Sequence, residues 1–322
     1  MRLVVASHNH VGKKLAYPIR TNRGLLFMPH GKELTEILIS RIQNLGVTYI
    51  YVEEKFSEEV IMELSFEELI KEDIIKHLTS LYINIQKTQI VDERLVHFLV
   101  QLILNNINLS ENAVFYREPT DNEYDKLALH SLEVAFYCIN IAKHRRMRIQ
   151  ELEKIIASAL LHDIGKLLDD TRGSHEERAV NILRRNPNIA PLVYVPILHL
   201  HEKIDGTGKF KVPKDKLHVH SQILHLTNNY SNHIEKFSDI NQRVEMMNME
   251  AGTRYDLKVF KNAMEVLYCY PNGLMVTLTN ATQGLVCKQN IGFPSRPVIV
   301  RLDGHVIDLM KEPTIFIKEI IS

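Results

Sequence analysis

The segment LLHDIGK, residues 160–166, contains the side chains best suited to chemistry in this sequence. His162 and Asp163 follow an apolar run, where ionisable side chains are costly unless they are paired or bound to a metal ion. An imidazole can ligate a metal, a carboxylate can bridge two ions, and the ammonium of Lys166 stands nearby. Gly165 is expected to adopt the left-handed conformation that ends a helix. Together these residues suit a metal-assisted reaction on a phosphate ester.

Further candidate ligands lie where they could converge on this segment. His130 lies early in the preceding predicted helix, His175 directly follows a helix cap, and His201 stands with Glu202 at the end of a later helix. Of the 16 histidines in the chain, 10 lie in the window 130–233, where an even spread would put about 5. A single histidine is more often a surface or hydrogen-bonded core residue, but the group as a whole favours a metal site.

Apolar residues at helical spacing predict the elements that would position these side chains. Ser174 and Glu177 form a capping box that opens one of the helices. The predicted helices comprise residues 132–142, 151–161, 175 to about 185, a fourth that ends near 202, 217–231 and 257–267.

The regions on either side of these helices have sequence patterns that predict other secondary structure. Residues 1–55 predict a small α/β unit, with strands at 14–19, 25–28 and 47–52, a turn at 21–24 and a helix at 32–45 stopped by Gly46. Residues 56–118 predict helices that serve as a connector or as the first layer of the next domain. Period-two patterns predict strands at 275–279, 285–289 and 298–302, with turns at 280–284 and 303–304. The two terminal regions are expected to pack on each other or on a second subunit.

Four segments together resemble the HD-GYP domains of the HD metal-dependent phosphohydrolase superfamily: His130, HDIGK at 162–166, SHEERAVNIL at 174–183 and HEKIDGTGKF at 201–210. MEAGTRYDLKVF at 249–260 is similar to the segment that follows the site in that family. The N-terminal unit and YPNGLMVTLTNATQGLVCKQN at 270–290 resemble the flanking regions of Gram-positive, spore-former-type members.

This resemblance covers nearly the whole chain and implies its fold class. The expected protein is mainly α. An all-helical HD-type domain at 119–270 would be flanked by the α/β unit at 1–55, the helical connector at 56–118 and a β-rich extension at 271–322.

The resemblance also implies an activity, namely hydrolysis of cyclic di-GMP to pGpG or GMP in signal transduction. One or two divalent ions, iron or manganese, would be the cofactor. Lys166 and Asp163 would be catalytic, and Asp163 would bridge two ions. The substrate would contact Lys166, Asp205, Gly206 and Gly208. The implied metal ligands are His130, His162, Asp163, His175 and His201, with Asn228 as a weak or lost ligand.

Several positions depart from the family pattern. Leu200 stands where the family has a histidine, and Asn228 where it has its final aspartate, which is a poor exchange at a divalent site. His199 or His225 could fill a vacated ligand position. Lys126 replaces the glutamate of the trinuclear subclass, so three ions are not expected. Lys209 and Phe210 replace the tyrosine and proline of the family tripeptide, and residues 231–237 lack its basic and aromatic segment.

Two functions remain open on these residues. The first is a metal-dependent phosphodiesterase impaired by a degenerate metal site, and the retained histidines and aspartate favour it. The alternative is a non-catalytic HD-GYP-like module that binds a nucleotide or a protein partner in signalling. A purely structural role is disfavoured, because burying histidine and aspartate side chains costs folding free energy unless they have a function.

Composition excludes several other classes of protein. The 322 residues carry 39 basic and 39 acidic side chains, which argues against a nucleic-acid polymer as partner. The three cysteines form no CxxC pair, so neither a disulfide framework nor a thiolate zinc site is expected. The sequence has no apolar stretch near the roughly 20 residues of a membrane helix, and its beginning does not read as a signal peptide. A cytoplasmic protein that takes a cyclic dinucleotide or related phosphate ester is expected, alone, as a homodimer or with a protein partner.

Overall fold

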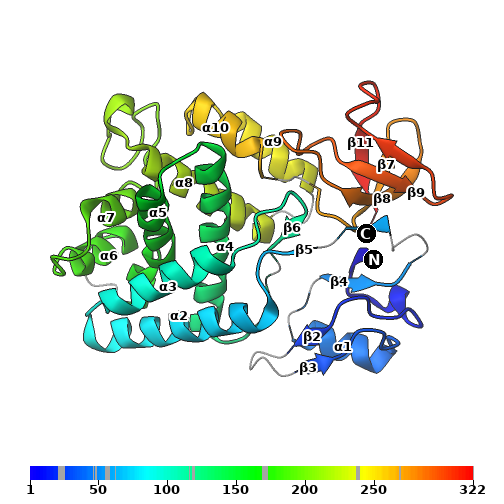
Figure 1. Cartoon of the computed structure of the whole chain (residues 1–322), viewed down its shortest axis with the longest axis horizontal. Helices are drawn as coiled ribbons and strands as arrows, with labels where there is room; N and C mark the ends of the chain where they lie inside the picture. Colours follow the sequence, from blue (N-terminus) through cyan, green and yellow to red (C-terminus); the bar gives the residue numbers. More distant parts are fainter. Residues whose placement is uncertain are drawn as a thin grey trace.

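The fold is seen in a computed structural model (Figure 1). The structure describes residues 1–20, 26–45, 47, 49–54, 59–61, 63–115, 117, 120–168, 173–236, 240–267 and 270–321. The predicted turn at 21–24, the helix stop at Gly46 and the cysteine at 269 lie outside these residues. Within the described part, every helix falls short of the length and apolarity needed to cross a membrane.

Helices build the larger part of the molecule, on the left of Figure 1. Helix starts carry side-chain caps where the sequence offers them: Asn122 accepts from two backbone amides, and the capping box of Ser174 and Glu177 is formed. The helices are α2 (Glu68–Thr88), α3 (Glu93–Asn106), α4 (Glu123–His144), α5 (Ile149–Leu161), α6 (His175–Leu183), α7 (Pro191–Leu198), α8 (Val219–Lys236), α9 (Ile240–Glu250) and α10 (Leu257–Met264). Helix α9 was not predicted from the sequence.

Helix α4 is central to this helical unit. It packs against α2, α5 and α8, and nearly all its side chains from Ala128 to Ala142 are buried. One continuous apolar cluster extends from Phe66 in front of α2 to Leu267 beyond α10. Because α2 and α3 share this core, they form the first layer of the helical unit, which is one of the two roles predicted for residues 56–118.

The N-terminal unit is a small α/β arrangement, as predicted. Its strands are β1 (Arg2–Val5), β2 (Ile19–Arg20), β3 (Leu26–Met28) and β4 (Tyr49–Val52), and its helix is α1 (Glu36–Asn44). The unpredicted β1 pairs antiparallel with β4, and β2 pairs with β3. The strand expected at 14–19 is mostly replaced by isolated bridges from Lys14 and Leu15.

The C-terminal extension is a five-stranded antiparallel sheet of order β10-β9-β8-β7-β11. Its strands are β7 (Met275–Leu278), β8 (Gln283–Lys288), β9 (Val298–Arg301), β10 (Val306–Asp308) and β11 (Ile317–Ile320). The first three match the predicted strands closely. Strands β10 and β11 were missed because their side chains are mostly half-exposed or exposed, which leaves little apolar alternation.

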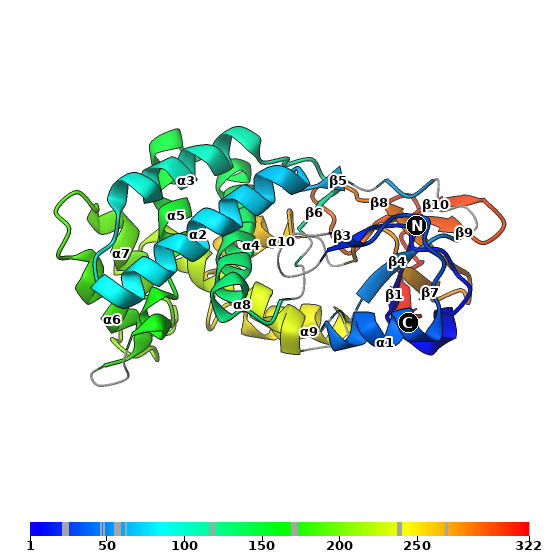
Figure 2. The same cartoon turned by 90° about the horizontal axis from the view of Figure 1, so that it is seen from below.

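The two terminal regions pack on each other, on the same side of the helical unit in both views (Figures 1 and 2). The amide of Leu3 donates to the carbonyl of Gly273 at 2.7 Å, and Leu3 also packs against the core of the C-terminal sheet. Strand β5 (Glu63–Leu64) pairs in parallel with β6 (Ala113–Val114) between these regions and the helices. The predicted fold class, a mainly α protein with small α/β and β flanks, is therefore confirmed.

Candidate metal centre

Two groups of side chains with the donor atoms of metal ligands lie side by side in the helical unit. We name the group His130, His162 and Asp163 the inner cluster, and the group His175, Glu176 and His201 the outer cluster. In each group the donor atoms lie within 4.8 Å of one another. All five predicted histidine and aspartate ligands belong to these clusters, and Glu176 is an addition that the sequence analysis did not make.

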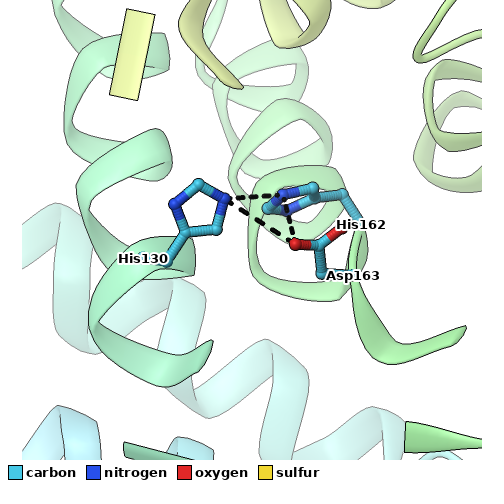
Figure 3. Close-up of side chains that lie close together, drawn as sticks. All are labelled: His130, His162 and Asp163. Carbon is cyan, nitrogen blue, oxygen red and sulfur yellow. Dashed lines mark hydrogen bonds and ion pairs between the residues drawn. The ribbon is translucent and has the colours of Figure 1, made fainter. Parts of the chain in front are cut away.

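The inner cluster is buried at the junction of α4 and α5 (Figure 3). His130 comes from the first half of α4, while His162 caps α5 and Asp163 follows it. The exposed fractions are 8% for His130, 0% for His162 and 1% for Asp163. His162 Nε2 lies 3.3 Å from His130 Nε2 and 3.4 Å from Asp163 Oδ2. The helix end thus places an imidazole and a carboxylate against a second imidazole with almost no access to solvent.

Hydrogen bonds orient both inner imidazoles. His162 Nδ1 lies 2.7 Å from the carbonyl oxygen of Ala159, so Nδ1–H donates and the Nε2 lone pair faces the cluster. His130 Nδ1 lies 3.1 Å from Ser231 Oγ, which in turn donates to Glu133 Oε2 at 2.7 Å. Both tautomers of His130 find partners in this structure. Nδ1–H can donate to Ser231, whereas Nε2–H can donate to Asn228 Oδ1, 3.0 Å away, with Arg117 Nη2 then donating to Nδ1 at 3.4 Å. Metal ligation through Nε2 would select the first tautomer. Such outer hydrogen bonds are the usual way in which ligating histidines are held.

The buried carboxylate of Glu133 is balanced by a cation. Arg117 contacts Glu133 in a close ion pair and donates to Ser231 Oγ at 2.8 Å. A buried charge is costly unless it is paired. The ion pair with Arg117 therefore offsets the cost of burying the Glu133 carboxylate behind Ser231 and His130.

Asn228 of α8 faces the same point as the inner lone pairs. Its Oδ1 lies 3.0 Å from His130 Nε2 and accepts from Asn232 Nδ2 at 3.2 Å. The structure therefore places the predicted weak ligand beside the inner cluster, where it offers a carbonyl oxygen without charge.

Electrostatics keep the inner histidines neutral and the carboxyl ionised. Burial lowers the pKa of His130 to about 3 and also lowers that of His162. Burial alone would raise the pKa of Asp163, but His162, Lys166 and His130 outweigh it and bring that pKa to about 2. Neutral imidazoles and a carboxylate are the protonation states that metal ligation requires.

The separations within the inner cluster fit a divalent cation. Metal–ligand bonds of about 2.1 Å hold neighbouring ligand atoms roughly 3.0 to 3.4 Å apart in octahedral or tetrahedral geometry. From His130 Nε2 the separations are 3.0 Å to Asn228 Oδ1 and 3.3 Å to His162 Nε2, both within this range, and 3.7 Å to Asp163 Oδ2, which is beyond it. Lone pairs that converge at these distances repel one another unless a cation or a proton lies between them.

The outer cluster is more open to solvent. His175 is the first residue of α6 and His201 follows α7, with side chains 26% and 51% exposed. Glu176 lies between them, and its Oε1 is 2.9 Å from His175 Nε2 and 2.8 Å from His201 Nε2. Burial would raise the pKa of Glu176, but the hydrogen bonds from both histidines outweigh it and lower the pKa. Glu176 is therefore a buried carboxylate at an accessible site.

Asp163 joins the two clusters. Its Oδ2 faces His162 and His130, while its Oδ1 lies 3.6 Å from His175 Nε2. Among the described residues Oδ1 is buried and makes no hydrogen bond. Lys166 Nζ lies 2.5 Å from Oδ2, and its side chain is 51% exposed. One carboxylate thus has an oxygen directed to each cluster and a half-exposed ammonium beside it.

Gly165 serves close packing, which corrects the predicted left-handed turn. Its φ is not in the left-handed region, and residues 164–167 form a 3-10 turn. A Cβ at Gly165 would lie 1.8 Å from the carbonyl oxygen of His175. The absence of a side chain lets the start of α6 approach the HD segment, and this approach brings the two clusters together.

The loop that contains Asp205, Gly206 and Gly208 borders the outer cluster through His201. Asp205 Oδ1 accepts from the amide and the hydroxyl of Thr207, and Gly206 has a φ of +76°, so both residues shape the turn. A Cβ at Gly208 would come within 2.7 Å of Glu202. Their assignment to substrate binding stays a prediction.

Buried Glu202 anchors the far end of this loop. Its carboxylate accepts from the amides of Phe210 and Val212 at 2.7 and 2.8 Å. Lys209 then ties the loop to the start of α6 through Ser174 and Glu177. Lys209, which stands where the family has a tyrosine, thus forms an ion pair with Glu177.

The residues at and around the vacated ligand position lie as follows. Leu200 is fully buried in the apolar core. His199 packs near the ring of Phe210, and His225 packs its ring between His201 and Tyr255. The structure brings Glu176, rather than His199 or His225, into the donor cluster. The sequence contains a signal for this residue, since Glu176 directly follows His175. From the sequence, only the next glutamate, Glu177, is interpreted, as part of a helix cap.

Comparisons with known proteins agree with this geometry. The HD domain family model matches residues 127–233. Cyclic di-GMP phosphodiesterase PA4108 of Pseudomonas aeruginosa is 23% identical over 237 residues, which cover 66% of this chain and 56% of that protein. The chain therefore spans little more than half the length of this curated relative. A solved structure, that of Bd1817, an HDG"Y"P protein from Bdellovibrio bacteriovorus, has a TM-score of 0.46 and 11% identity, over 81% of this chain and 97% of that chain.

The matched residues 127–233 include both clusters and Asn228, so these side chains belong to an HD domain. The resemblance drawn from the sequence is confirmed over these residues, and the chain contains an HD domain.

Proposed function

We propose that this protein is a metal-dependent phosphodiesterase that hydrolyses cyclic di-GMP. The observation that carries the proposal is the pair of donor clusters joined by Asp163, whose two oxygens face opposite clusters. The curated relative, described as a cyclic di-GMP phosphodiesterase, supports the choice of substrate. Hydrolysis adds water across a phosphodiester bond, so each ring opening yields one phosphomonoester and one hydroxyl.

The inner cluster would hold the more tightly bound ion. His130, His162 and Asp163 are its ligands, with the carbonyl oxygen of Asn228 beside them. Divalent iron or manganese bound here would act as a Lewis acid toward the phosphate ester and would lower the pKa of water. The chain of Ser231 and Glu133 behind His130 would accept the Nδ1 proton when Nε2 binds the ion.

The open side of the centre would receive the substrate. His201 and Lys166 each have a side chain that is 51% exposed, whereas the inner cluster is closed to solvent. Lys166 bonds Asp163 Oδ2 in this structure, and a bound ion that neutralises Asp163 would leave the ammonium available to a phosphate oxygen. Lys166 is therefore proposed to bind and stabilise the negative charge of the scissile phosphate.

The test is hydrolysis of cyclic di-GMP by the full chain, reconstituted anaerobically with Fe(II) or Mn(II). We expect turnover that disappears in His162→Ala. The matched control is His77→Ala, which removes a half-exposed histidine of α2 that contacts Asp73 and Phe98, outside both clusters, and which should retain turnover. Absence of turnover in the fully metal-loaded protein would contradict the proposal.

A non-catalytic module that binds a nucleotide or protein partner is the second candidate. It is favoured by Asn228, whose neutral oxygen already accepts a hydrogen bond from Asn232, and by the fully buried Leu200. Cyclic di-GMP that binds to the metal-loaded protein without being hydrolysed would select this function.

A further inference from the structure

The outer cluster has a ligand problem that the sequence alone does not solve. The family resemblance supplies histidines at 175 and 201 and an aspartate at 163, but Leu200 removes a third imidazole. Two imidazoles and one carboxylate oxygen would leave an ion at this position weakly held. The structure shows Glu176 where a further ligand is needed.

Glu176 is placed like a ligand. Its side chain is buried, with 5% of the residue exposed, yet its Oε1 lies within 2.9 Å of two imidazole nitrogens that are themselves accessible. It is the second residue of α6, and the start of a helix favours an anionic side chain. The capping box of Ser174 and Glu177 fixes this first turn. The Glu176 carboxylate also has hydrogen bonds with the Ser174 side chain and the helix-start backbone, while its Oε1 faces the two imidazoles.

A second, independent observation points to a cation at the same place. Asp163 Oδ1 is buried, has no hydrogen-bond partner among the described residues, and lies 3.6 Å from His175 Nε2. Two carboxylates, those of Asp163 and Glu176, thus lie within 3.6 Å of the same atom, His175 Nε2. A divalent cation would satisfy the unpartnered oxygen and both carboxylate charges at once.

We propose that Glu176 is a metal ligand, and that it replaces the imidazole lost at Leu200 in a second ion site formed with Asp163, His175 and His201. The inference rests on the proposed metal-dependent function, and it adds a carboxylate ligand that the family pattern does not supply. A site with two carboxylates and two imidazoles is harder than one with three imidazoles, so it favours Mn(II) or Fe(II) over softer metals. The extra negative charge also reduces the net positive charge that the second ion presents to a phosphate.

The competing explanation is that Glu176 is an ordinary hydrogen-bond acceptor that orients His175 and His201. Metal stoichiometry separates the two explanations without any need for activity. The wild-type chain, Glu176→Gln, Glu177→Gln and His201→Gln are purified free of metal and dialysed anaerobically against Mn(II). Bound manganese per chain is then measured by elemental analysis, and coupling between two Mn(II) ions by electron paramagnetic resonance.

We expect two ions and a coupled signal in the wild-type chain and in Glu177→Gln, which removes the same charge from the same helix turn. We expect one tightly held, uncoupled ion in Glu176→Gln, with affinity for the second ion lowered by more than the about 10- to 100-fold that removal of a merely orienting group costs. Thermal unfolding of the metal-free variants checks that each chain is folded. His201→Gln alters a half-exposed residue and reports on the same site if Glu176→Gln does not fold.

Two coupled ions bound to Glu176→Gln with an affinity within about 100-fold of the wild-type value would overturn the inference, because an orienting role accounts for a loss of that size. A single ion in the wild-type chain, or two in His201→Gln, would also overturn it. These results are distinct from failure of the proposed function: loss of the second ion in Glu176→Gln, in a protein that never hydrolyses cyclic di-GMP, supports the ligand role and contradicts only the proposed activity. No bound metal in the wild-type chain would contradict both.

Discussion

Two regions of this molecule bury polar side chains, and they do so in different ways. Where the C-terminal sheet meets the connector, Asn112, Asn272 and Gln289 are each at most 5% exposed. Asn272 Nδ2 donates to the carbonyl of Ile61, and Asn272 Oδ1 accepts from Gln289 Nε2 at 2.7 Å. In that group each contact joins a donor to an acceptor, although Gln289 Oε1 has no partner among the described residues. In the inner cluster of the helical unit, acceptors outnumber donors. His162 Nε2 and Asn228 Oδ1 both face the single proton that His130 Nε2 can carry, and Asp163 Oδ1 has no hydrogen-bond partner among the described residues.

This difference separates structural from functional burial. A buried polar group that is hydrogen-bonded stabilises a fold modestly, and it is costly mainly when its partner is removed. Acceptors that outnumber the protons between them stabilise the fold less, because the lone pairs left without a proton repel one another until a cation is bound. The inner cluster is therefore expected to add little to the stability of the metal-free fold and much to metal affinity. The group of Asn112, Asn272 and Gln289 should contribute to stability alone.

The largest expected effect is that of Asp163→Asn. This change removes the carboxylate that faces both clusters, so the metal-loaded protein should lose at least about a hundredfold in phosphodiesterase activity and bind fewer ions. The metal-free protein should unfold at a modestly lower temperature, because the change removes the ion pair with half-exposed Lys166, one of the contacts that hold the pKa of Asp163 at about 2. Calorimetry with and without Mn(II) measures both effects. A strongly destabilised metal-free variant would break the comparison.

Asn272→Leu should behave in the opposite way. The carbonyl of Ile61 and the amide of Gln289 would lose a buried partner, at a cost of about 2 to 4 kcal/mol in the free energy of unfolding. Bound manganese per folded chain should stay at the wild-type value, since Asn272 lies outside both clusters. Urea unfolding measures the first quantity and elemental analysis the second; a loss of metal would show that the two regions are coupled.

Asn228→Asp tests the inner cluster by adding a charged ligand to it. A carboxylate beside His130 Nε2 adds a negative charge to the donor set, and affinity for the inner ion should rise about tenfold, which corresponds to about 1.4 kcal/mol. The metal-free protein should become less stable, because a second carboxylate would then face the inner cluster beside that of Asp163. Competition with a Mn(II) chelator measures the affinity, and turnover should rise with it if the lost aspartate limits activity. Unchanged affinity would show that Asn228 lies outside the ligand shell.

His220 provides the smallest test, because it is a buried histidine of α8 that is not part of either cluster. Burial lowers the pKa of His220 to about 4, and the nearby His218 adds a smaller lowering effect. Glu151 and a hydrogen bond with the backbone of Leu192 raise the pKa, but by less. The unfolded chain therefore takes up a proton near pH 6.5 while the folded chain does not. Stability is fully present above pH 6.5 and is lost as the pH falls toward 4.

Between pH 7 and 5.5 this residue should cost the fold about 1 kcal/mol. His220→Gln should flatten the pH dependence of the unfolding free energy by that amount and leave metal content unchanged. An equally steep curve in the variant would show that other histidines account for the acid sensitivity.

Local patterns were sufficient for much of the architecture. Apolar periodicity predicted the long central helices and the three buried strands of the C-terminal sheet, and Ser174 with Glu177 predicted the start of α6. The same patterns missed β1, β10, β11 and α9, whose partners are distant in sequence or whose faces are largely exposed. The role of Gly165 was misjudged, because its neighbour is the backbone of His175 and a close approach of two segments leaves no local signature.

The sequence by itself determined which side chains are available for metal chemistry, because residue type and helix ends specify the imidazoles and carboxylates of 130, 162, 163, 175 and 201. Only the tertiary structure decided how they are combined. Packing of α6 against the HD segment directs one oxygen of Asp163 to each cluster and brings Glu176 between two histidines. Donor atoms must lie within a few ångströms to share an ion, and that distance is a property of the packed core rather than of the spacing along the chain.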